Sequence, residues 1–373
     1  MTTIRAIEVR EIAADLGNGF SGGTYSVKRR AALLCRITLE NGHKTTVCVG
    51  NESEYSDYLK AQIRGPFRDS IVGKSVLDIE KHWQAMLEGN TAYIPREDFI
   101  KALATVDTAL WVMKAEELGV PLWSLLGGAH GRVRVIGIGG YYETSRDAAG
   151  IEREMAEYKR LGLAGIKFKV GAVSLEEDAK RVRAAREAAG PDFAIVVDSN
   201  MAWTPTEAVR FANMIRDLDP EWIEEPVHPK NVVRGLKEVR YRSGLPTGAG
   251  QSEISVFDSF RLLTSGSVDV INMTYNRGGG ISAWQKLAHA AEMVDIRVAQ
   301  VGEPHISMHL MGGVANSTFV EIYPEPHRDP FWHNLYRGIP PIVNGYIELP
   351  SAPGIGMDID LDEAERYATE DWS

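Results

Sequence analysis

Two lysines alternate with apolar residues in the stretch GIKFKVG, residues 165–171. Side chains of a β-strand point alternately to its two faces, so Lys167 and Lys169 share one face of this strand. Lysine is almost never fully buried unless its charge is paired or used. The spacing therefore predicts either an exposed edge strand or a strand whose lysine face meets something anionic.

Acidic and amide side chains follow the next two strand-like runs. VVDSN supplies Asp198 and Asn200, and WIEEP supplies Glu224. Lys169 precedes Asp198 by 29 residues and Asp198 precedes Glu224 by 26, which is one strand–helix unit each. In a parallel barrel such groups converge at the carboxyl ends of the strands, where active sites lie. Neighbouring carboxylates repel unless a cation lies among them, and oxygen ligands without Cys or His nearby select Mg²⁺.

A lysine pair beside a metal site has a chemical use. Burial and the like charge of Lys167 are expected to lower the pKa of Lys169 below its ordinary value of ~10.4. A lysine brought toward neutrality can act as a general base, a role typically worth ~10²–10⁴-fold in rate. We expect Lys169 to remove a proton α to a carboxylate, with Mg²⁺ stabilising the resulting enediolate.

Eight strand-like runs separated by helical stretches must position these residues. The runs are VRVIGIGG, AGIKFKVG, FAIVVDSN, EWIEEP, LPTGAG, VDVINMTY, IRVAQVG and TFVEIY. Alternating strands and helices indicate a parallel sheet, and eight strands close a barrel. We therefore predict a TIM-type (β/α)7–8 barrel.

The parts of the chain outside these runs differ in pattern. IRAIEVREI alternates, AALLCRITLENGHKTTVCVG predicts a hairpin turning at ENG, and helical periodicity follows. We predict an α+β capping domain over residues 1–128, the barrel over 129–340, and a segment over 341–373 that packs back on the cap.

Composition excludes several classes of function. The 373 residues carry a formal net charge of -10, which gives no support to binding of nucleic acid or of an anionic membrane. The two cysteines form no metal-type spacing, and neither a secretory signal nor an apolar run of membrane-spanning length is present. A cytoplasmic soluble protein with a small anionic carboxylate substrate is expected.

With these motifs the chain resembles the mandelate racemase/muconate lactonizing branch of the enolase superfamily. The resemblance covers essentially the whole chain and includes KFKVG, VVDSN, WIEEP, GGGISAW and VDTALWVMKAEELGVPLWSLLGG. It implies that Lys169 is the base, that Lys167 lies near the substrate carboxylate, and that Asn200 lies close by. Asp198 and Glu224 would be metal ligands. Members most like this one often dehydrate sugar acids.

The chain also departs from the family pattern. Where such enzymes usually read GE on the fifth strand, this chain reads GQSE. Gln251 takes the expected place of the third ligand, but Mg²⁺ prefers an anion, so we favour Glu253 and keep Gln251 as the alternative. Many relatives carry an Asp–His dyad on strands six and seven. Here Thr274 replaces the Asp, and Gln300 and Val301 stand where the His is expected.

Loss of the dyad counts against a simple racemase, which needs a base on each face of the α-carbon. Dehydration of a hydroxy acid by one base, or isomerisation of a lactone, remains open. The leaving hydroxyl needs a proton donor, for which His305 and Glu321 are candidates. Tyr141 and Tyr142 close the first barrel strand and are candidates to contact substrate. The loops at residues 16–26 and 49–58 are expected to cover the site.

The leading hypothesis is a metal-dependent lyase acting on a sugar acid, with a lactone cycloisomerase or an epimerase of the same family as alternatives. A second hypothesis is a degenerate barrel that only binds an anion, and a third is an aldolase that forms a Schiff base on Lys169. Barrels of this type commonly self-associate, so a homo-oligomer is expected.

Overall fold

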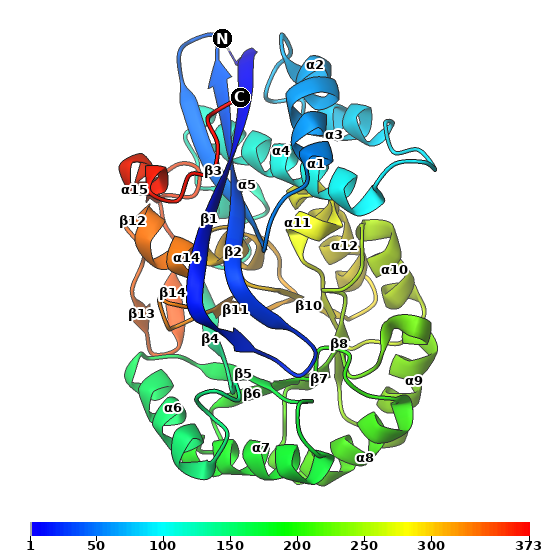
Figure 1. Cartoon of the computed structure of the whole chain (residues 1–373). Helices are drawn as coiled ribbons and strands as arrows, with labels where there is room; N and C mark the ends of the chain where they lie inside the picture. The colour runs from blue at the N-terminus through cyan, green and yellow to red at the C-terminus, as the bar shows by residue number, and fades with distance from the viewer. Residues whose placement is uncertain (1) are drawn as a thin grey trace.

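The computed structural model describes residues 2–373, and its larger part is a closed barrel of eight parallel strands (Figure 1). The strands are β4 (Arg132–Gly139), β5 (Gly165–Lys169), β6 (Ala194–Asp198), β7 (Trp222–Glu224), β8 (Thr247–Ala249), β9 (Val270–Asn272), β10 (Arg297–Gln300) and β11 (Ser317–Ile322). β11 pairs with β4, which closes the ring. All eight predicted strands are confirmed.

The barrel interior is filled below the site by a separate apolar cluster. It includes Ile136, Val196, Trp222, Val270 and Phe319, all buried. Outside the ring lie α6 (Ala148–Arg160), α7 (Leu175–Ala189), α8 (Pro205–Ile215), α9 (Val232–Ser243), α10 (Val256–Thr264), α12 (Ile281–Glu292) and α13 (Pro304–Gly313), with the short α11 (Tyr275–Gly278). Reciprocal caps by Ser174 with Glu177 and by Thr204 with Glu207 set where α7 and α8 begin.

The N-terminal cap is an antiparallel sheet with helices against it. The sheet has β1 (Ile4–Ser21), β2 (Ser26–Leu39) and β3 (Lys44–Glu52), and β2 turns into β3 at Gly42, within the predicted hairpin. The helices are α1 (Asp57–Gln62), a π-helical turn (Ile63–Phe67), α2 (Arg68–Ile71), α3 (Ile79–Leu87), α4 (Arg96–Glu117) and α5 (Leu122–Leu125). Most of α4 is buried because it packs on the cap sheet and on α11 and α12 of the barrel.

The tip of the β1–β2 hairpin reaches over the barrel toward β5–β7 (Figure 1). Thr24 Oγ1 donates a hydrogen bond of 2.7 Å to the carbonyl of Asn200. A Cβ added at Gly23 would lie 2.8 Å from the backbone of Gly171, so only glycine allows this approach. The hairpin therefore covers the carboxyl ends of strands β5 and β6.

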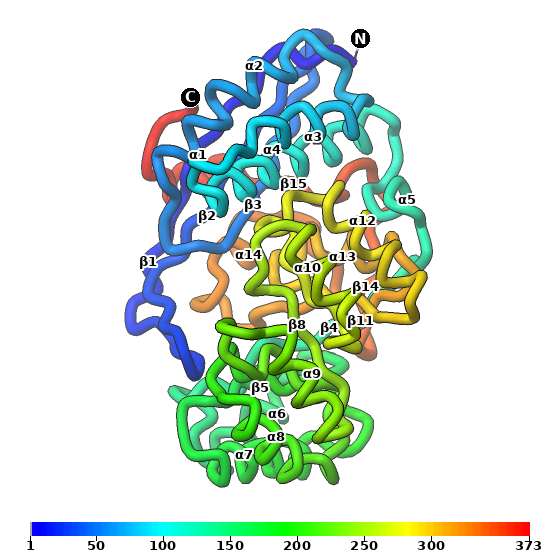
Figure 2. Tube along the Cα trace, turned by 90° about the vertical axis from the view of Figure 1, so that its right-hand side faces the viewer, coloured from blue at the N-terminus to red at the C-terminus, as the bar shows by residue number. Residues whose placement is uncertain are grey.

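The C-terminal segment divides between the two domains. β13 (Ile342–Val343) and β14 (Tyr346–Glu348) extend the barrel sheet, because β14 pairs with β4. α14 (Pro330–Leu335), β12 (Tyr336–Arg337), β15 (Asp358–Ile359) and α15 (Leu361–Glu365) follow or flank them. The chain then ends against β1, where Val9 and Ser373 exchange backbone hydrogen bonds, and both termini lie in the cap (Figure 2). The prediction that the whole segment packs on the cap is wrong for its first part.

Candidate active site

Lys167 and Lys169 lie inside the barrel and are almost completely buried. Lys169 Nζ lies 2.5 Å from Asp198 Oδ2 and 3.0 Å from Asn200 Oδ1. Lys167 Nζ lies 3.0 Å from Glu224 Oε1 and 2.7 Å from Glu321 Oε2. The two ammonium groups thus face three buried carboxylates, and the exposed-edge alternative is excluded.

Strand register brings these groups together. Lys169 pairs with Asp198 across β5–β6, and Asp198 pairs with Glu224 across β6–β7. The period of two then puts Lys167 one layer deeper, level with Val196 and Trp222. Trp222 Nε1 donates to Glu224 Oε2 at 3.0 Å and holds that carboxylate from below.

The expectation of a lowered lysine pKa is wrong for this arrangement. Burial is the largest single influence on Lys169 and lowers its pKa, but Asp198, Tyr25 and Tyr323 together raise the pKa above its ordinary value, and the like charge of Lys167 has a smaller influence. Burial likewise lowers the pKa of Lys167, and Glu224, Glu321 and Asp198 together raise it well above its ordinary value. The carboxylates lie closer to each lysine than the sequence pattern alone indicates.

The two candidates for the third metal ligand point in different directions. Gln251 follows β8, lines the same cavity as Lys169, and has a buried amide nitrogen without a hydrogen-bond partner. Glu253 turns instead toward α10, where its carboxylate lies 3.7 Å from Arg261. The preference for Glu253 as a ligand is therefore wrong, because the loop after β8 aims its side chain at a helix.

A cavity of about 620 Å³ opens at this end of the barrel, between it and the cap. Barrel residues that line it include Lys169, Asn200, Gln251, Thr274, Val301, Glu303 and Tyr323. The cap contributes residues 25–30 from the β1–β2 hairpin and residues 51–53 after β3. The two cap loops expected to cover the site thus both reach it.

Glu303 in this cavity is a residue that the sequence analysis missed. Its Oε1 accepts from Asn276 Nδ2 at 2.6 Å, and its Oε2 accepts from Gly50 N at 2.8 Å and from the Tyr275 hydroxyl. Its backbone has a φ of 47°, a left-handed value that costs a non-glycine residue free energy and is common at functional sites. Burial raises the pKa of Glu303 to about 7, against the donors Tyr275 and Gly50, which lower it.

His305 does not reach the cavity. It is the second residue of α13, its Nε2 lies 2.7 Å from the Cys48 carbonyl, and its ring stacks on Tyr336. Burial lowers its pKa to about 4, so the ring is neutral at physiological pH. The prediction of His305 as proton donor is therefore wrong: the start of α13 turns the side chain toward the cap.

The two predicted tyrosines also lie outside the cavity wall. Tyr142 donates to Asp178 of α7 at 2.8 Å and accepts from Ala172 N, so it packs on the outside of β4–β5. Tyr141 is fully buried behind the wall, with its hydroxyl 3.0 Å from that of Tyr25 and 3.3 Å from that of Tyr323. Tyr25 and Tyr323, not Tyr141 and Tyr142, line the cavity.

Two family models match the chain. One described as "Enolase C-terminal domain-like" matches residues 150–364, and one described as "Mandelate racemase / muconate lactonizing enzyme, N-terminal domain" matches residues 21–127. The chain belongs to the mandelate racemase/muconate lactonizing enzyme family of the enolase superfamily. This confirms the resemblance seen in the sequence.

Relatives of this family member are enzymes with several activities. The chain is 30% identical to the 3,6-anhydro-alpha-L-galactonate cycloisomerase of Streptomyces coelicolor, covering 81% of each chain. It is 28% identical to the arabinonate dehydratase of Saccharolobus solfataricus, covering 84% of each. Epimerases also match. A crystal structure of a family protein from a marine actinobacterium in complex with magnesium has a TM-score of 0.91 at 35% identity, covering 99% of both chains.

The donor set of this family member fits a hard divalent cation, with one neutral ligand. Within residues 2–373 no group of three or more His, Cys, Asp or Glu side chains is arranged to hold a metal ion. The paired carboxylates Asp198 and Glu224 are two anionic donors, and Gln251 lines the adjoining cavity together with Lys169. Mg²⁺ binds carboxylate and amide oxygens alike, so the amide oxygen of Gln251 would be the third donor.

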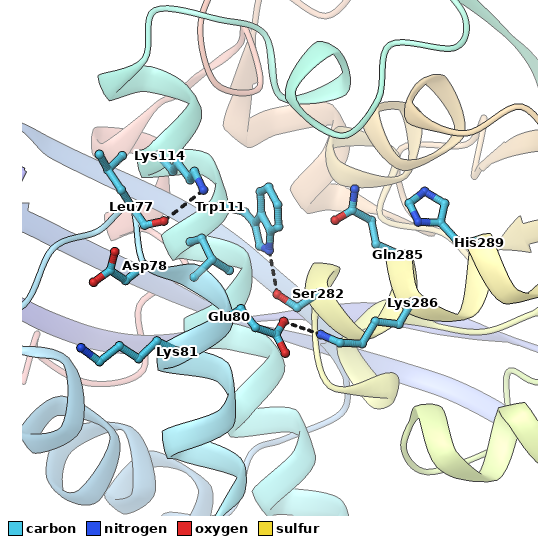
Figure 3. A pocket seen from close by; sticks show the side chains of 11 residues that line it. Leu77, Asp78, Glu80, Lys81, Trp111, Lys114, Ser282, Gln285, Lys286 and His289 are labelled. Atoms are coloured by element: carbon cyan, nitrogen blue, oxygen red, sulfur yellow. Dashed lines mark hydrogen bonds and ion pairs between the residues drawn. The ribbon is translucent and has the colours of Figure 1, made fainter.

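A second hollow of about 650 Å³ lies away from this site, where α3 and α4 of the cap meet α12 (Figure 3). Two pairs of its polar side chains link the cap to the barrel. Lys286 Nζ lies 2.6 Å from Glu80, and Trp111 Nε1 donates to Ser282 Oγ at 2.8 Å. This hollow therefore lies at the joint between the two domains. None of the helices in residues 2–373 is long and apolar enough to cross a membrane.

Proposed function

We propose that the protein is an acid-sugar lyase that removes the proton α to a carboxylate of a hydroxy acid and eliminates the β-hydroxyl as water. The observation that carries this proposal is the placement of Lys169 at the wall of the cavity between barrel and cap, in contact with Asp198, which pairs with Glu224 on the next strand. Named dehydratases among the relatives support the reaction class.

Three oxygen-bearing side chains support the first step. Asp198, Glu224 and Gln251 would hold Mg²⁺, which when bound would supply positive charge that stabilises the enediolate and offsets the Asp198 carboxylate, the carboxylate that raises the pKa of Lys169. Lys167 and Glu321, buried as an ion pair of 2.7 Å, keep a charged hydrogen-bonding group at the floor of the site. These two residues orient the carboxylate end of the substrate.

The protons move between two groups that line the cavity. Lys169, as the neutral amine, takes the α-proton on Nζ, and the electron pair of the broken C–H bond forms an enediolate. Glu303, protonated at its carboxyl, donates to the β-hydroxyl, so the C–O bond breaks and water leaves. The enol product then becomes a 2-keto-3-deoxy acid by tautomerisation, Lys169 releases its proton to solvent and Glu303 takes one up, and the sum is substrate to product plus one water.

A cycloisomerase is the second candidate, because a relative at 30% identity has that activity. It shares the Lys169 step and differs only in what leaves the β-carbon. In a lactone or anhydro sugar the departing oxygen stays attached to the product, so the product keeps the mass of the substrate.

The experiment is a screen of aldonic and aldaric acids and their lactones with Mg²⁺, read by mass spectrometry and NMR. The lyase gives a product lighter by one water, and chelation by EDTA stops it. A product of unchanged mass indicates a cycloisomerase or an epimerase. Mg²⁺ binding without turnover or α-proton exchange of any acid would leave only the anion-binding barrel.

A further inference from the structure

Three consecutive cations of the cap line the cavity that holds Lys169. Lys28, Arg29 and Arg30 lie near the start of β2, and all three contribute to its wall. Within residues 2–373 none of the three forms an ion pair. By contrast, Arg277 of α11, another cation that lines the cavity, lies 2.9 Å from Glu97 of the cap.

Arg30 is the most informative of these residues. Its side chain is buried, with 3% of its surface exposed, and it packs over Tyr323 with 4.6 Å between the guanidinium carbon and the ring centroid. Its Nε donates to the Arg328 carbonyl, but its Nη2 is buried without a hydrogen-bond partner. An unpaired buried donor on a charged group is costly, so the site is built to receive an acceptor there.

Two of the anions near these cations are already engaged. Glu52 lies 2.8 Å from Lys101, and Glu303 accepts from Tyr275, Asn276 and Gly50. Asp329 lies close enough to favour the charged form of Arg30 but forms no ion pair with it in the described chain. The cap end of the cavity therefore keeps an excess of positive charge, and guanidinium groups bind carboxylate or phosphate through paired hydrogen bonds.

We propose that the substrate carries a second anionic group at its far end, bound by Arg30 with Lys28, which lies on the same face of β2, at the cavity rim. This inference rests on the proposed function, which puts the first carboxylate at Lys167, Lys169 and the metal ligands. A cavity of about 620 Å³ is of the size that holds a small ligand. Among sugar acids, the chemistry selects an aldaric acid or an aldonic acid with a terminal phosphate over a simple aldonic acid.

The test compares acids that differ only at the far end. An aldaric acid, the aldonic acid of the same configuration and its terminal phosphate are assayed for kcat/KM with Mg²⁺. We expect the wild-type protein to prefer a dianion by at least tenfold, which corresponds to ~1.4 kcal/mol. The better of the two dianions identifies the distal group as carboxylate or phosphate.

Variants test whether these cations cause the preference for a dianion. Lys28 is exposed, so Lys28→Ala is expected to fold and to reduce the preference for the dianion at least tenfold, as is Arg30→Gln. Lys44→Ala, an exposed lysine of the cap sheet away from the cavity, is the control and should keep the wild-type ratio. The inference would be overturned if the wild type had the same kcat/KM on the dianions as on the simple aldonic acid. It would also be overturned if the variants lowered kcat/KM on the dianions and on the aldonic acid by the same factor.

Calorimetric binding of the same acids separates this inference from the proposed function. A dianion bound at least tenfold more tightly, without turnover of any acid, supports the distal site while contradicting the lyase. Turnover of the simple aldonic acid alone supports the lyase and contradicts the distal site.

Discussion

At the residue scale, Glu303 changes how the missing dyad is understood. Of the positions expected for the dyad, Thr274 and Val301 line the cavity with side chains that exchange no proton at neutral pH, and Gln300 accepts from Tyr275 N, whereas Glu303 lies two residues after Val301 in the same wall. Tyr275 and Asn276, from the loop after β9, hold its carboxylate. An acid–base group thus reaches the cavity from the end of β10 by a shift of two residues along the chain.

Glu303→Gln should therefore slow dehydration far more than it slows removal of the α-proton. The amide keeps the shape of the side chain but donates no acidic proton, so dehydration should fall by ~10²–10⁴-fold. Exchange of the α-proton, which depends on Lys169, should fall far less. Because burial raises the pKa of Glu303 to about 7, the protonated acid is lost above that pH, and the dehydration rate should decline there in the wild type only.

NMR in D₂O measures both processes in one sample across a pH series. Glu253→Gln is the matched control, because that glutamate follows β8 but turns to Arg261. If Glu303→Gln dehydrates the acid as fast as the wild type does, Glu303 is not the proton donor and only connects Gly50 of the cap to the barrel.

The residues that could be predicted are those whose position follows from strand periodicity. Lys167, Lys169, Asp198 and Glu224 lie at the ends of apolar runs, where a period of two decides the face. Glu303 is a left-handed residue in the turn before α13, which begins at Pro304, and His305 lies in the first turn of that helix, so strand periodicity applies to neither.

At the element scale, α4 of the cap and α12 of the barrel are joined by a buried carboxylate. Asp107 of α4 accepts from Ser282 N at 2.8 Å and from Ser282 Oγ at 2.6 Å, in the first turn of α12. Burial raises its pKa to about 7, although the Ser282 donors lower it. The positive end of the α12 dipole also favours an acceptor at this place.

This joint predicts a pH dependence of stability. In the unfolded chain the pKa of Asp107 is ~3.9, so from about that pH up to about 7 the folded protein holds a proton that the unfolded chain has lost. The contribution of Asp107 to stability is full below pH ~4 and declines as pH rises through 7.

Asp107→Asn keeps an acceptor for Ser282 N and removes the titration. From pH 5 to pH 8 the free energy of unfolding of the wild type should fall by at least ~1 kcal/mol more than that of the variant. Urea unfolding at both pH values measures this, with the exposed Asp192→Asn as control. If the free energy of unfolding changes by the same amount between the two pH values in the variant and in the wild type, Asp107 is not the titrating group.

Long, strongly periodic elements were predictable and short ones were not. The strand runs and the helix of α4 follow from apolar spacing over many residues. β14 has three residues and joins β4 through tertiary contact, so the sequence assigned its segment to the cap. The pattern of a three-residue strand is too short to show which sheet it enters.

At the scale of the whole molecule, the cap decides what the barrel can bind. Its hairpin lies over β5–β7, and its cations and the loop after β3 complete the cavity. The C-terminal segment holds the cap sheet through Arg10, which contacts Glu365 at 2.5 Å and the Glu370 carbonyl at 2.6 Å. No local pattern encodes this docking, because it depends on residues more than a hundred positions apart.

Gly23→Ala tests closure by the hairpin. The added Cβ would meet the Gly171 backbone at 2.8 Å, so the tip must move away from the cavity. We expect kcat/KM on the identified acid to fall by roughly tenfold or more, since a misplaced closing segment can cost ~10²-fold. Gly131→Ala is the control, because its Cβ would meet no atom within 4 Å. Equal activity of both variants and the wild type would show that the hairpin does not need this contact.

The central claim is that Lys169 removes the proton next to a substrate carboxylate. The most direct measurement is deuterium incorporation at the α-carbon of a bound acid, followed by NMR in D₂O with Mg²⁺ for the wild type, Lys169→Ala and the exposed control Lys180→Ala. Circular dichroism verifies that each variant is folded. Exchange by the wild type and Lys180→Ala, with a loss of ~10²–10⁴-fold in Lys169→Ala, is the predicted result. Exchange that survives in folded Lys169→Ala would contradict the account.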